Sequence, residues 1–435
     1  MVVRLRTRLK IIALLFAVPL GMAITVLCQA QGLQPYYDGI ATYDYDPTYT
    51  YLMGGLSVLK GEIPAFADHP GTLTHILVAL AIALASSFPW WSELPVDSCQ
   101  SQVCFVFDYP EVVLRLAGWM GLGLWFFAIG IFGWTLYRYW RLSVAETMVC
   151  QAVFLSAPLL LLYGFVVNGE TVGVPMVLLS FSALIASRDS EGWSSWLMPF
   201  LAGVALAGCL LAKLNFLPFV LLLLLLREPR RFALASLSWF GSVLWLGHRF
   251  TRWDGWQSFW GAVTRHQGNY GSGVEGFLDA SRSVERVQDL SREFPLVFVL
   301  AILSLMLWVL LWRRPKRLGE KASISVRRLL QESAVLGAGC GLLFTPNATD
   351  RLRLALIAMS LALFARLNAR QPWSTAMESK SIELQIDATV LLLIFAGCLA
   401  GVLKHFDPRY MTSALVVSAM ALALCCRASA TVDHG

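Results

Sequence analysis

The sequence predicts an all-α polytopic membrane protein with about twelve transmembrane helices, roughly 10–13. Three observations lead to this fold class. Hydrophobic residues make up 57% of the 435 residues and charged residues only 14%, against about 25% charged residues in soluble domains. Apolar runs of roughly spanning length recur along the whole chain. Short Lys and Arg clusters separate these runs, as the positive-inside rule expects for cytoplasmic loops.

The amino-terminal run follows a basic leader, MVVRLRTRLK. Its apolar part of about 18 residues exceeds the 7–15 of a signal peptide, and CQAQG is a poor cleavage site. We therefore expect an uncleaved first span, a cytoplasmic amino terminus and a location in the plasma (inner) membrane. The net charge of +6 lies in the clusters between spans, so it predicts contact with membrane lipid and not with nucleic acid.

The spans are expected within one integral-membrane domain, 1–435. The run 196–226 is too long for one span, and Lys213, Asn215 and Pro218 interrupt it, so it predicts two short spans that meet at 213–215. The other expected spans are 11–30, 112–137, 144–167, 172–186, 232–250, 294–312, 329–345, 352–364, 386–403 and 411–426.

The apolar stretch 72–88 decides the topology. If it does not cross, the later basic clusters all fall inside, whereas crossing would turn them all outward. We therefore expect 72–88 to lie in the interface or to re-enter. The region 31–110 is then one long external, periplasmic loop with interfacial helices, and 251–293 is a second external loop. A disulfide between Cys99 and Cys104 is plausible in an oxidising compartment, and two free thiols are the alternative.

Acidic residues are concentrated in the first external loop. Asp44 and Asp46 lie in YDYDP, where a carboxylate can act as a general base toward an acceptor hydroxyl or can simply form a turn before proline. Asp68 and His69 could contribute to a divalent-metal site, and His69 could instead make a local hydrogen bond. Glu62 belongs to the same loop, in the turn GEIP.

Further charged residues fall at expected external helix ends. Glu170 lies in NGET, and Lys213 interrupts an apolar run, where an ionisable residue is a functional candidate. Lys213 could bind a phosphate or snorkel to the interface. In the second external loop, His266 and Tyr270 lie in HQGNYGSG, a glycine-rich segment that could close over a sugar or phosphate.

The last expected external turn, 404–410, concentrates positive charge. Arg409 suits bidentate phosphate binding, and Lys404 precedes it. Anchoring at the interface is the alternative for both. The sequence contains no P-loop, HExxH or GxSxG motif, so the prediction depends on how these polar residues are distributed together.

The order of these features resembles the GT-C superfamily of polyprenyl-phosphate-sugar-dependent glycosyltransferases, which includes protein O-mannosyltransferases and aminoarabinose transferases. Asp46 opens TYTYLMGGLSVLKGEIP, and Asp68-His69-Pro70-Gly71 is similar to the Asp-x-His-Pro-Pro-Leu element of that family. The similarity is strongest over residues 10–120. Pro47 follows Asp46 where the family often has glutamate, and Gly71 replaces the second proline.

The resemblance implies a GT-C-like helical bundle that moves a sugar from a polyprenyl-phosphate donor to a lipid, glycan or protein acceptor. Asp46, or next Asp44, would be the catalytic acid. Lys213, His266, Lys404 and Arg409 would contact the donor phosphate, and Glu62, Glu170 and Tyr270 would contact substrate. A divalent metal, held by Asp68 and His69, is the cofactor that this resemblance allows. The alternative function is a transporter or flippase for a lipid-linked sugar.

Overall fold

The computed structural model describes residues 2–30, 48–64, 71–87, 102–156, 165–250, 288, 376–404 and 411–432. These residues form helices and no strand. The helices are α1 (Val2–Ala30), α3 (Thr48–Leu59), α4 (Thr72–Ser87), α5 (Gln102–Asp108), α6 (Pro110–Tyr139), α7 (Val144–Ala152), the 3₁₀ helix η4 (Val153–Ser156), α9 (Gly169–Arg188), α10 (Ser194–Ala212), the 3₁₀ helix η6 (Leu214–Leu225), α11 (Pro229–Phe250), α17 (Ala376–Lys404) and α18 (Met411–Val432).

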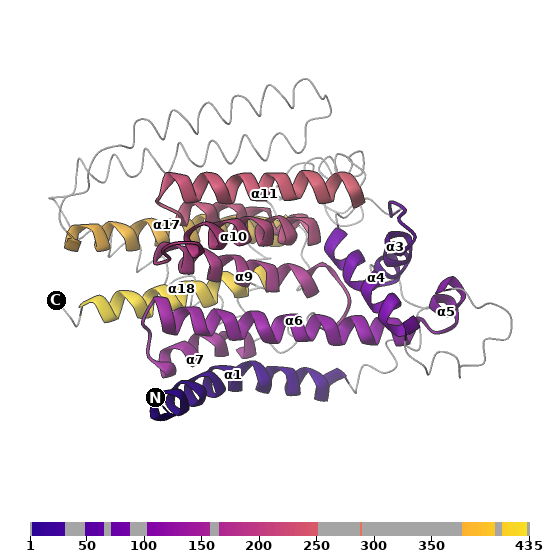
Figure 1. Cartoon of the computed structure of the whole chain (residues 1–435), viewed down its shortest axis with the longest axis horizontal. Coiled ribbons are helices and arrows are strands. Elements are labelled where there is room, and N and C mark those ends of the chain that lie inside the picture. Colours follow the sequence, from indigo (N-terminus) through magenta and orange to yellow (C-terminus); the bar gives the residue numbers. More distant parts are fainter. Residues whose placement is uncertain are drawn as a thin grey trace, which may run out of the picture.

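The long helices lie side by side along the long axis of the molecule (Figure 1). Four of them are long and apolar enough to cross a membrane: Leu9–Cys28 of α1, and the whole of α6, α9 and α10. Shorter apolar helices include α4, η6 and parts of α17 and α18. The described part of the chain therefore agrees with an all-α membrane protein. The expected spans 294–312, 329–345 and 352–364 lie outside the described residues.

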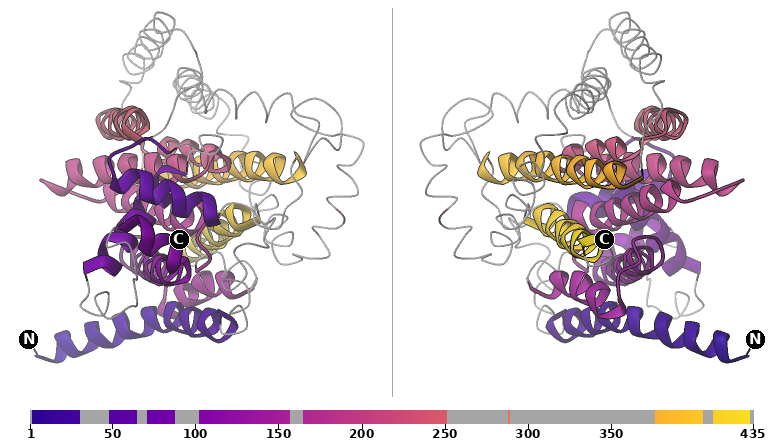
Figure 2. Two further views of the ribbon diagram at one scale, coloured as in Figure 1. Left: turned by 90° about the vertical axis from the view of Figure 1, so that its right-hand side faces the viewer. Right: turned by 90° about the vertical axis from the view of Figure 1, so that its left-hand side faces the viewer.

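Two charged clusters mark opposite ends of the bundle. At the arginine end, Arg188 at the end of α9 reaches Asp387 of α17. At the lysine end, Glu170 near the start of α9 pairs with Lys213, the residue after α10. The 20 residues of α9 separate these ends by about 30 Å at 1.5 Å per residue. The start of α1 and the end of α18 lie toward the arginine end (Figure 1), and Figure 2 shows the bundle along its long axis from both ends.

The predicted break in the apolar run 196–226 is present at Lys213. The helix α10 ends at Ala212, and Lys213 is extended, with φ −163°. The following η6 is a 3₁₀ helix of 12 residues, or about 24 Å at 2.0 Å per residue. Its last carbonyl, on Leu225, accepts hydrogen bonds from the Arg188 guanidinium. The chain therefore turns at the lysine end and returns to the arginine end.

A proline inside α1 shapes the contact with α7. Because Pro19 has no N–H, the carbonyl of Leu15 lacks its helical donor. Gln151 of α7 donates to this carbonyl at 3.0 Å and to that of Ile129 in α6 at 2.9 Å. Gly133 is required beside it, because an added Cβ would collide with the Gln151 amide. One buried glutamine thus joins three helices.

Pro175 in α9 has the same effect on Thr171, four residues earlier. The freed Thr171 carbonyl accepts a hydrogen bond from Trp125 Nε1 of α6 at 3.2 Å. In an apolar surrounding such carbonyls must find a partner within the protein. The Trp125 hydrogen bond replaces the missing helical one and holds α6 against α9.

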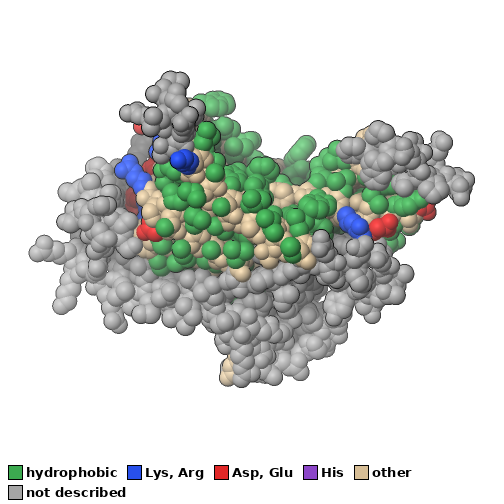
Figure 3. Space-filling model, turned by 90° about the horizontal axis from the view of Figure 1, so that it is seen from below, with side chains coloured by type: hydrophobic (Ala, Val, Ile, Leu, Met, Phe, Trp, Pro, Cys, Tyr) green, Lys and Arg blue, Asp and Glu red, His purple; other side chains and the backbone are tan. Residues whose placement is uncertain are grey.

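The outer surface of α1 and α6 is apolar. Figure 3 shows hydrophobic side chains across the middle of this face, with charged groups toward its two ends. Exposed apolar side chains on these two helices include Leu9, Ile12, Leu14, Leu20, Ile24, Trp119, Phe127 and Ile131. An apolar face this large suits contact with lipid chains and not with water.

The stretch expected to lie in the interface forms α4 at the lysine end. It packs with α3 as a helical hairpin and also contacts α6, α9 and α10 (Figure 1). Nine of its 16 residues are buried. In the adjacent α5, Cys104 is disulfide-bonded. Its predicted partner Cys99 lies outside the described residues, so that pairing stays a prediction.

The expected span 144–167 differs from the structure. There α7 ends at Ala152, the chain continues as the 3₁₀ helix η4 to Ser156, and 165–167 are not helical. Residues 157–164 lie outside the described residues. The start of α7 is well defined, because Ser143 and Glu146 form a reciprocal capping box.

Candidate functional site

Lys213 and Glu170 form a buried ion pair at the lysine end. Lys213 Nζ lies 2.7 Å from Glu170 Oε1. Glu170 is 0% exposed and Lys213 is 7% exposed. Sequence analysis selected both residues separately, and the structure brings them together. The predicted substrate and phosphate roles of the two residues remain predictions.

A glycine allows the close approach of the two helix ends. An added Cβ on Gly169 would lie 2.9 Å from the Ala212 carbonyl oxygen and 3.0 Å from Lys213 Cβ and Cδ. Any larger residue would therefore displace the lysine stem or the end of α10. The absent side chain of Gly169 lets Lys213 lie across the first turn of α9 and reach Glu170.

The first turn of α9 is held by a capping box. Asn168 Oδ1 accepts from Thr171 N at 3.0 Å, and Asn168 N donates to Thr171 Oγ1 at 3.0 Å. The Asn168 carbonyl also accepts a hydrogen bond from Thr74 Oγ1 of α4 at 3.1 Å. Three hydrogen bonds among Thr74, Asn168 and Thr171 thus fix this turn. Its geometry is set before any ligand binds.

Both charges occupy favourable helix ends. Glu170 lies at the amino-terminal end of α9, where the helix dipole favours an anion, and Lys213 follows the carboxyl-terminal end of α10, where it favours a cation. Removing two charges from water is costly even when they pair. A buried pair of this kind in an apolar bundle is therefore a candidate functional site.

Two polar atoms of this turn have no hydrogen-bond partner among the described residues. They are Glu170 Oε2 and Asn168 Nδ2, both fully buried. Buried polar groups are nearly always satisfied in proteins, since leaving one unpaired costs about 1–3 kcal/mol. Asn168 was not selected from the sequence. Its position in NGET, shortly before the expected span 172–186, was the signal that could have identified it as a helix cap.

A second buried polar group lies in the α3–α4 hairpin. The ring of His75 is 2% exposed, and its centroid lies 5.3 Å from that of Tyr51. Gly54 gives the imidazole its space, because an added Cβ would lie 2.5 Å from His75 Cδ2. Burial lowers the pKa of His75 to about 4, so the ring is neutral at pH 7. His75 Nδ1 has no hydrogen-bond partner.

The hairpin adjoins the predicted acidic loop. Its helix α3 begins at Thr48, two residues after Asp46, and α4 begins at Thr72, shortly after Asp68 and His69. Glu62 is exposed in the turn after α3. Sequence analysis did not select His75 as a site residue. Its burial in the hairpin, which a single sequence does not reveal, makes it a candidate.

The remaining predicted site residues cannot be placed beside this pair. Lys404 is the last residue of α17, and its side chain is not described. The predicted residues outside the described ranges are Asp44, Asp46, Asp68, His69, His266, Tyr270 and Arg409. Within the described ranges, no group of three or more His, Cys, Asp or Glu residues could hold a metal ion. The metal prediction for Asp68 and His69 remains untested.

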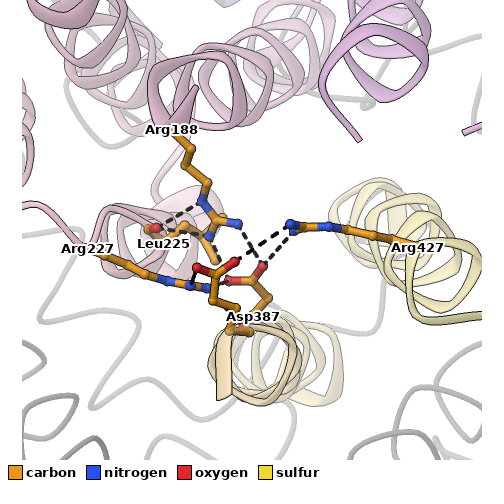
Figure 4. A network of polar contacts seen from close by, with 6 residues as sticks. Arg188, Leu225, Arg227, Asp387 and Arg427 are labelled. Atoms are coloured by element: carbon orange, nitrogen blue, oxygen red, sulfur yellow. Dashed lines mark hydrogen bonds and ion pairs between the residues drawn. The ribbon is translucent and has the colours of Figure 1, made fainter. Parts of the chain in front are cut away.

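The arginine end carries a different charge cluster (Figure 4). Arg188 binds Asp387 with both terminal nitrogens, at 2.8 and 2.7 Å. Arg227 contacts the same carboxylate at 3.1 Å and Glu383 at 2.6 Å. Arg427 approaches Asp387 at 3.5 Å. These contacts join α9, α17, α18 and the segment before α11, so we assign this cluster a structural role.

Comparisons with protein-family models, with curated proteins and with solved structures found no match to this chain. The class that the structure supports is an all-α protein with membrane-spanning helices.

Proposed function

We propose that this protein is an integral-membrane glycosyltransferase that moves a sugar from a polyprenyl-phosphate donor to an acceptor on the external face of the membrane. The observation that carries the proposal is the buried Lys213–Glu170 pair at the lysine end. This is the end that the positive-inside rule assigns to the outside, because the arginine cluster lies at the other. The Cys104 disulfide in α5 agrees with an oxidising compartment there.

The depth of the pair favours an enzyme over a carrier. The 19 residues of α10 span about 28 Å, close to the roughly 30 Å hydrocarbon thickness of a bilayer. Lys213 follows directly, so it lies at a membrane boundary when Ser194 lies at the other. Transporters place their substrate site near the midplane, on interrupted helices. At Lys213 the chain reverses direction instead.

The expected chemistry follows from the residues near this boundary. Asp46, with Asp44 as the next candidate, would accept a proton from the acceptor hydroxyl as it attacks the sugar. The departing lipid phosphate would be stabilised by cations, for which Lys404, Arg409 and His266 are candidates. Lys213, which the sequence predicts for the same role, is paired with Glu170. Glu62, Glu170 and Tyr270 remain candidate substrate contacts. The apolar surface between helices would hold the lipid tail.

A divalent metal would serve the same purpose as these cations. Asp68 and His69 are the residues that would bind it, and it would neutralise charge on the leaving phosphate. The described residues contain no alternative metal cluster.

One assay distinguishes a glycosyltransferase from a carrier. Purified protein is incubated with a panel of polyprenyl-phosphate sugars, with and without divalent metal. The assay follows hydrolysis or transfer by the wild type and by Asp46→Asn. We expect wild-type turnover that disappears in Asp46→Asn while the donor still binds. Binding without turnover under every condition would indicate a carrier or flippase. No binding of any polyprenyl donor would contradict both functions.

A further inference from the structure

The first turn of α9 offers one unsatisfied donor and one unsatisfied acceptor within three residues. Asn168 Nδ2 carries the hydrogens, and Glu170 Oε2 carries the lone pairs. Both side chains are almost entirely buried, at 2% and 0% exposure. Gly169, between them in the chain, lies under the stem of Lys213. The turn therefore presents a donor, an acceptor and a neutralised ammonium group.

We propose that this turn binds an uncharged hydroxyl group of the ligand, and that it recognises the sugar and not the phosphate. A hydroxyl donates one hydrogen bond and accepts others, so a single hydroxyl complements both unsatisfied atoms. A phosphate has only acceptor oxygens near neutral pH and would meet the Glu170 carboxylate. This inference rests on the proposed function, because it names the part of the donor that the site recognises.

The charge balance of the site supports the same assignment. Lys213 Nζ already lies 2.7 Å from a carboxylate oxygen. A phosphate at Lys213 would have to displace Glu170, which would leave a fully buried carboxylate without its cation. A neutral hydroxyl leaves the ion pair intact. The Lys213–Glu170 pair therefore orients the acceptor atom Glu170 Oε2, and Lys213 acts as a positioning residue.

Hydrogen bonds hold this turn in one conformation. Asn168 Oδ1 is committed to Thr171 N, which leaves Nδ2 as the free part of the amide. The Asn168 backbone is held by Thr74 Oγ1. A rigid, buried site of this kind discriminates strongly, because a ligand that lacks the hydroxyl leaves both atoms unpaired.

The test uses two kinds of soluble short-chain probe, each a phosphodiester with one negative charge. The bare probe is citronellyl methyl phosphate, and the hexosyl probes are citronellyl phosphate esters of glucose, galactose or mannose. Equilibrium binding to the protein in lipid nanodiscs gives, for each variant, the ratio of affinities for the hexosyl and the bare probe. This ratio cancels effects on the phosphate and the tail. We expect at least one hexosyl probe to bind the wild type about 10-fold more tightly than the bare probe does. A 10-fold difference corresponds to about one charge-assisted hydrogen bond.

Two single variants each exchange a hydrogen-bond donor for an acceptor, or an acceptor for a donor, at one atom. Asn168→Asp keeps the capping oxygen but replaces the donor with an acceptor, and Glu170→Gln replaces the acceptor with a donor. Each should reduce the ratio to about 1. The double variant exchanges donor and acceptor, so a hydroxyl can bind in the opposite orientation, and the ratio should recover. Ser180→Ala, which removes a buried structural hydrogen bond from α9 to α10 away from this turn, should keep the wild-type ratio.

The outcomes separate the two claims. If the wild type binds both kinds of probe with equal affinity, or if both single variants keep the preference, the hydroxyl assignment is wrong and the proposed function stands. If Glu170→Gln tightens both probes equally, Lys213 binds phosphate and this inference fails. If the wild type binds neither probe, the proposed function falls and this inference falls with it.

Discussion

Arg188 and Asp387 are joined by two hydrogen bonds of 2.8 and 2.7 Å although 199 residues separate them in the chain. The carboxylate is 2% exposed, and it also receives Arg227. This contact attaches the carboxyl-terminal helices α17 and α18 to the bundle formed by the first half of the chain.

Asp387→Asn should destabilise the protein by about 3–5 kcal/mol, because it leaves partly buried arginines without their shared carboxylate. Thermal unfolding in nanodiscs, with limited proteolysis between α11 and α17, measures the loss. Glu383→Gln is the matched control, since Glu383 is 30% exposed and should cost about 1 kcal/mol or less. Equal effects of the two variants would contradict a buried anchor at Asp387.

Gln151→Leu should cost about 1–3 kcal/mol, because it removes the donor that replaces the helical N–H missing at Pro19. Pro19→Ala restores a donor to the Leu15 carbonyl. In the Pro19→Ala background, Gln151→Leu should therefore cost less. A double-mutant cycle on unfolding free energies measures this coupling. Strictly additive effects would show that the Leu15 carbonyl does not depend on Gln151.

Gly169→Ala should separate Lys213 from Glu170, because the new Cβ meets the lysine stem and the Ala212 carbonyl. We expect a loss of stability of roughly 1–3 kcal/mol and weaker donor binding. Gly123→Ala in α6 is the control, since no atom lies within 4 Å of its added Cβ. It should be neutral or slightly stabilising. Similar losses in both variants would indicate a general helix effect.

His75 should make stability fall with acidity. Its folded pKa of about 4 lies below the ordinary value of 6.5, so the unfolded chain binds the proton first. The contribution is lost as the pH falls from about 6.5 to about 4, by up to about 3 kcal/mol. Unfolding temperatures across this range should be less pH-dependent in His75→Gln. Identical pH profiles would show that other groups dominate.

Single cysteines should label from opposite sides of the membrane. Glu62→Cys lies at the lysine end and Glu228→Cys at the arginine end, both at exposed positions. With Cys28, Cys425 and Cys426 replaced, a membrane-impermeant maleimide should label Glu62→Cys in intact cells and Glu228→Cys only after lysis. The reverse pattern would overturn the external assignment of the lysine end.

The sequence predicted the parts of the fold that depend on local chemistry. Long apolar runs located α6, α9 and α10, and the change of composition at Lys213 located the turn into η6. The early end of α7 was missed, because an apolar run continues past Ala152. The spacing and hydropathy of the apolar residues do not indicate where such a run stops being α-helical.

The tertiary contacts were not predictable in the same way. Asp387 lies within the expected span 386–403, and no local sequence pattern connects it with Arg188. Lys213 and Glu170 were each selected as charges in apolar surroundings, but 43 residues separate them, so their pairing required the fold. The candidate site was therefore half predicted: Glu170, Lys213 and the NGET turn were identified, whereas the role of Asn168 and the contact between the turn and Lys213 were not.

The Arg188–Asp387 contact also sets the order in which the protein can be completed. A ribosome adds about 5–20 residues each second, so Asp387 is synthesised roughly 10–40 s after Arg188. With the arginine end cytoplasmic, as the proposed function has it, we expect lipid phosphates of that leaflet to pair with Arg188 and Arg227 during this interval. Arrival of α17 would then exchange these lipids for the Asp387 carboxylate.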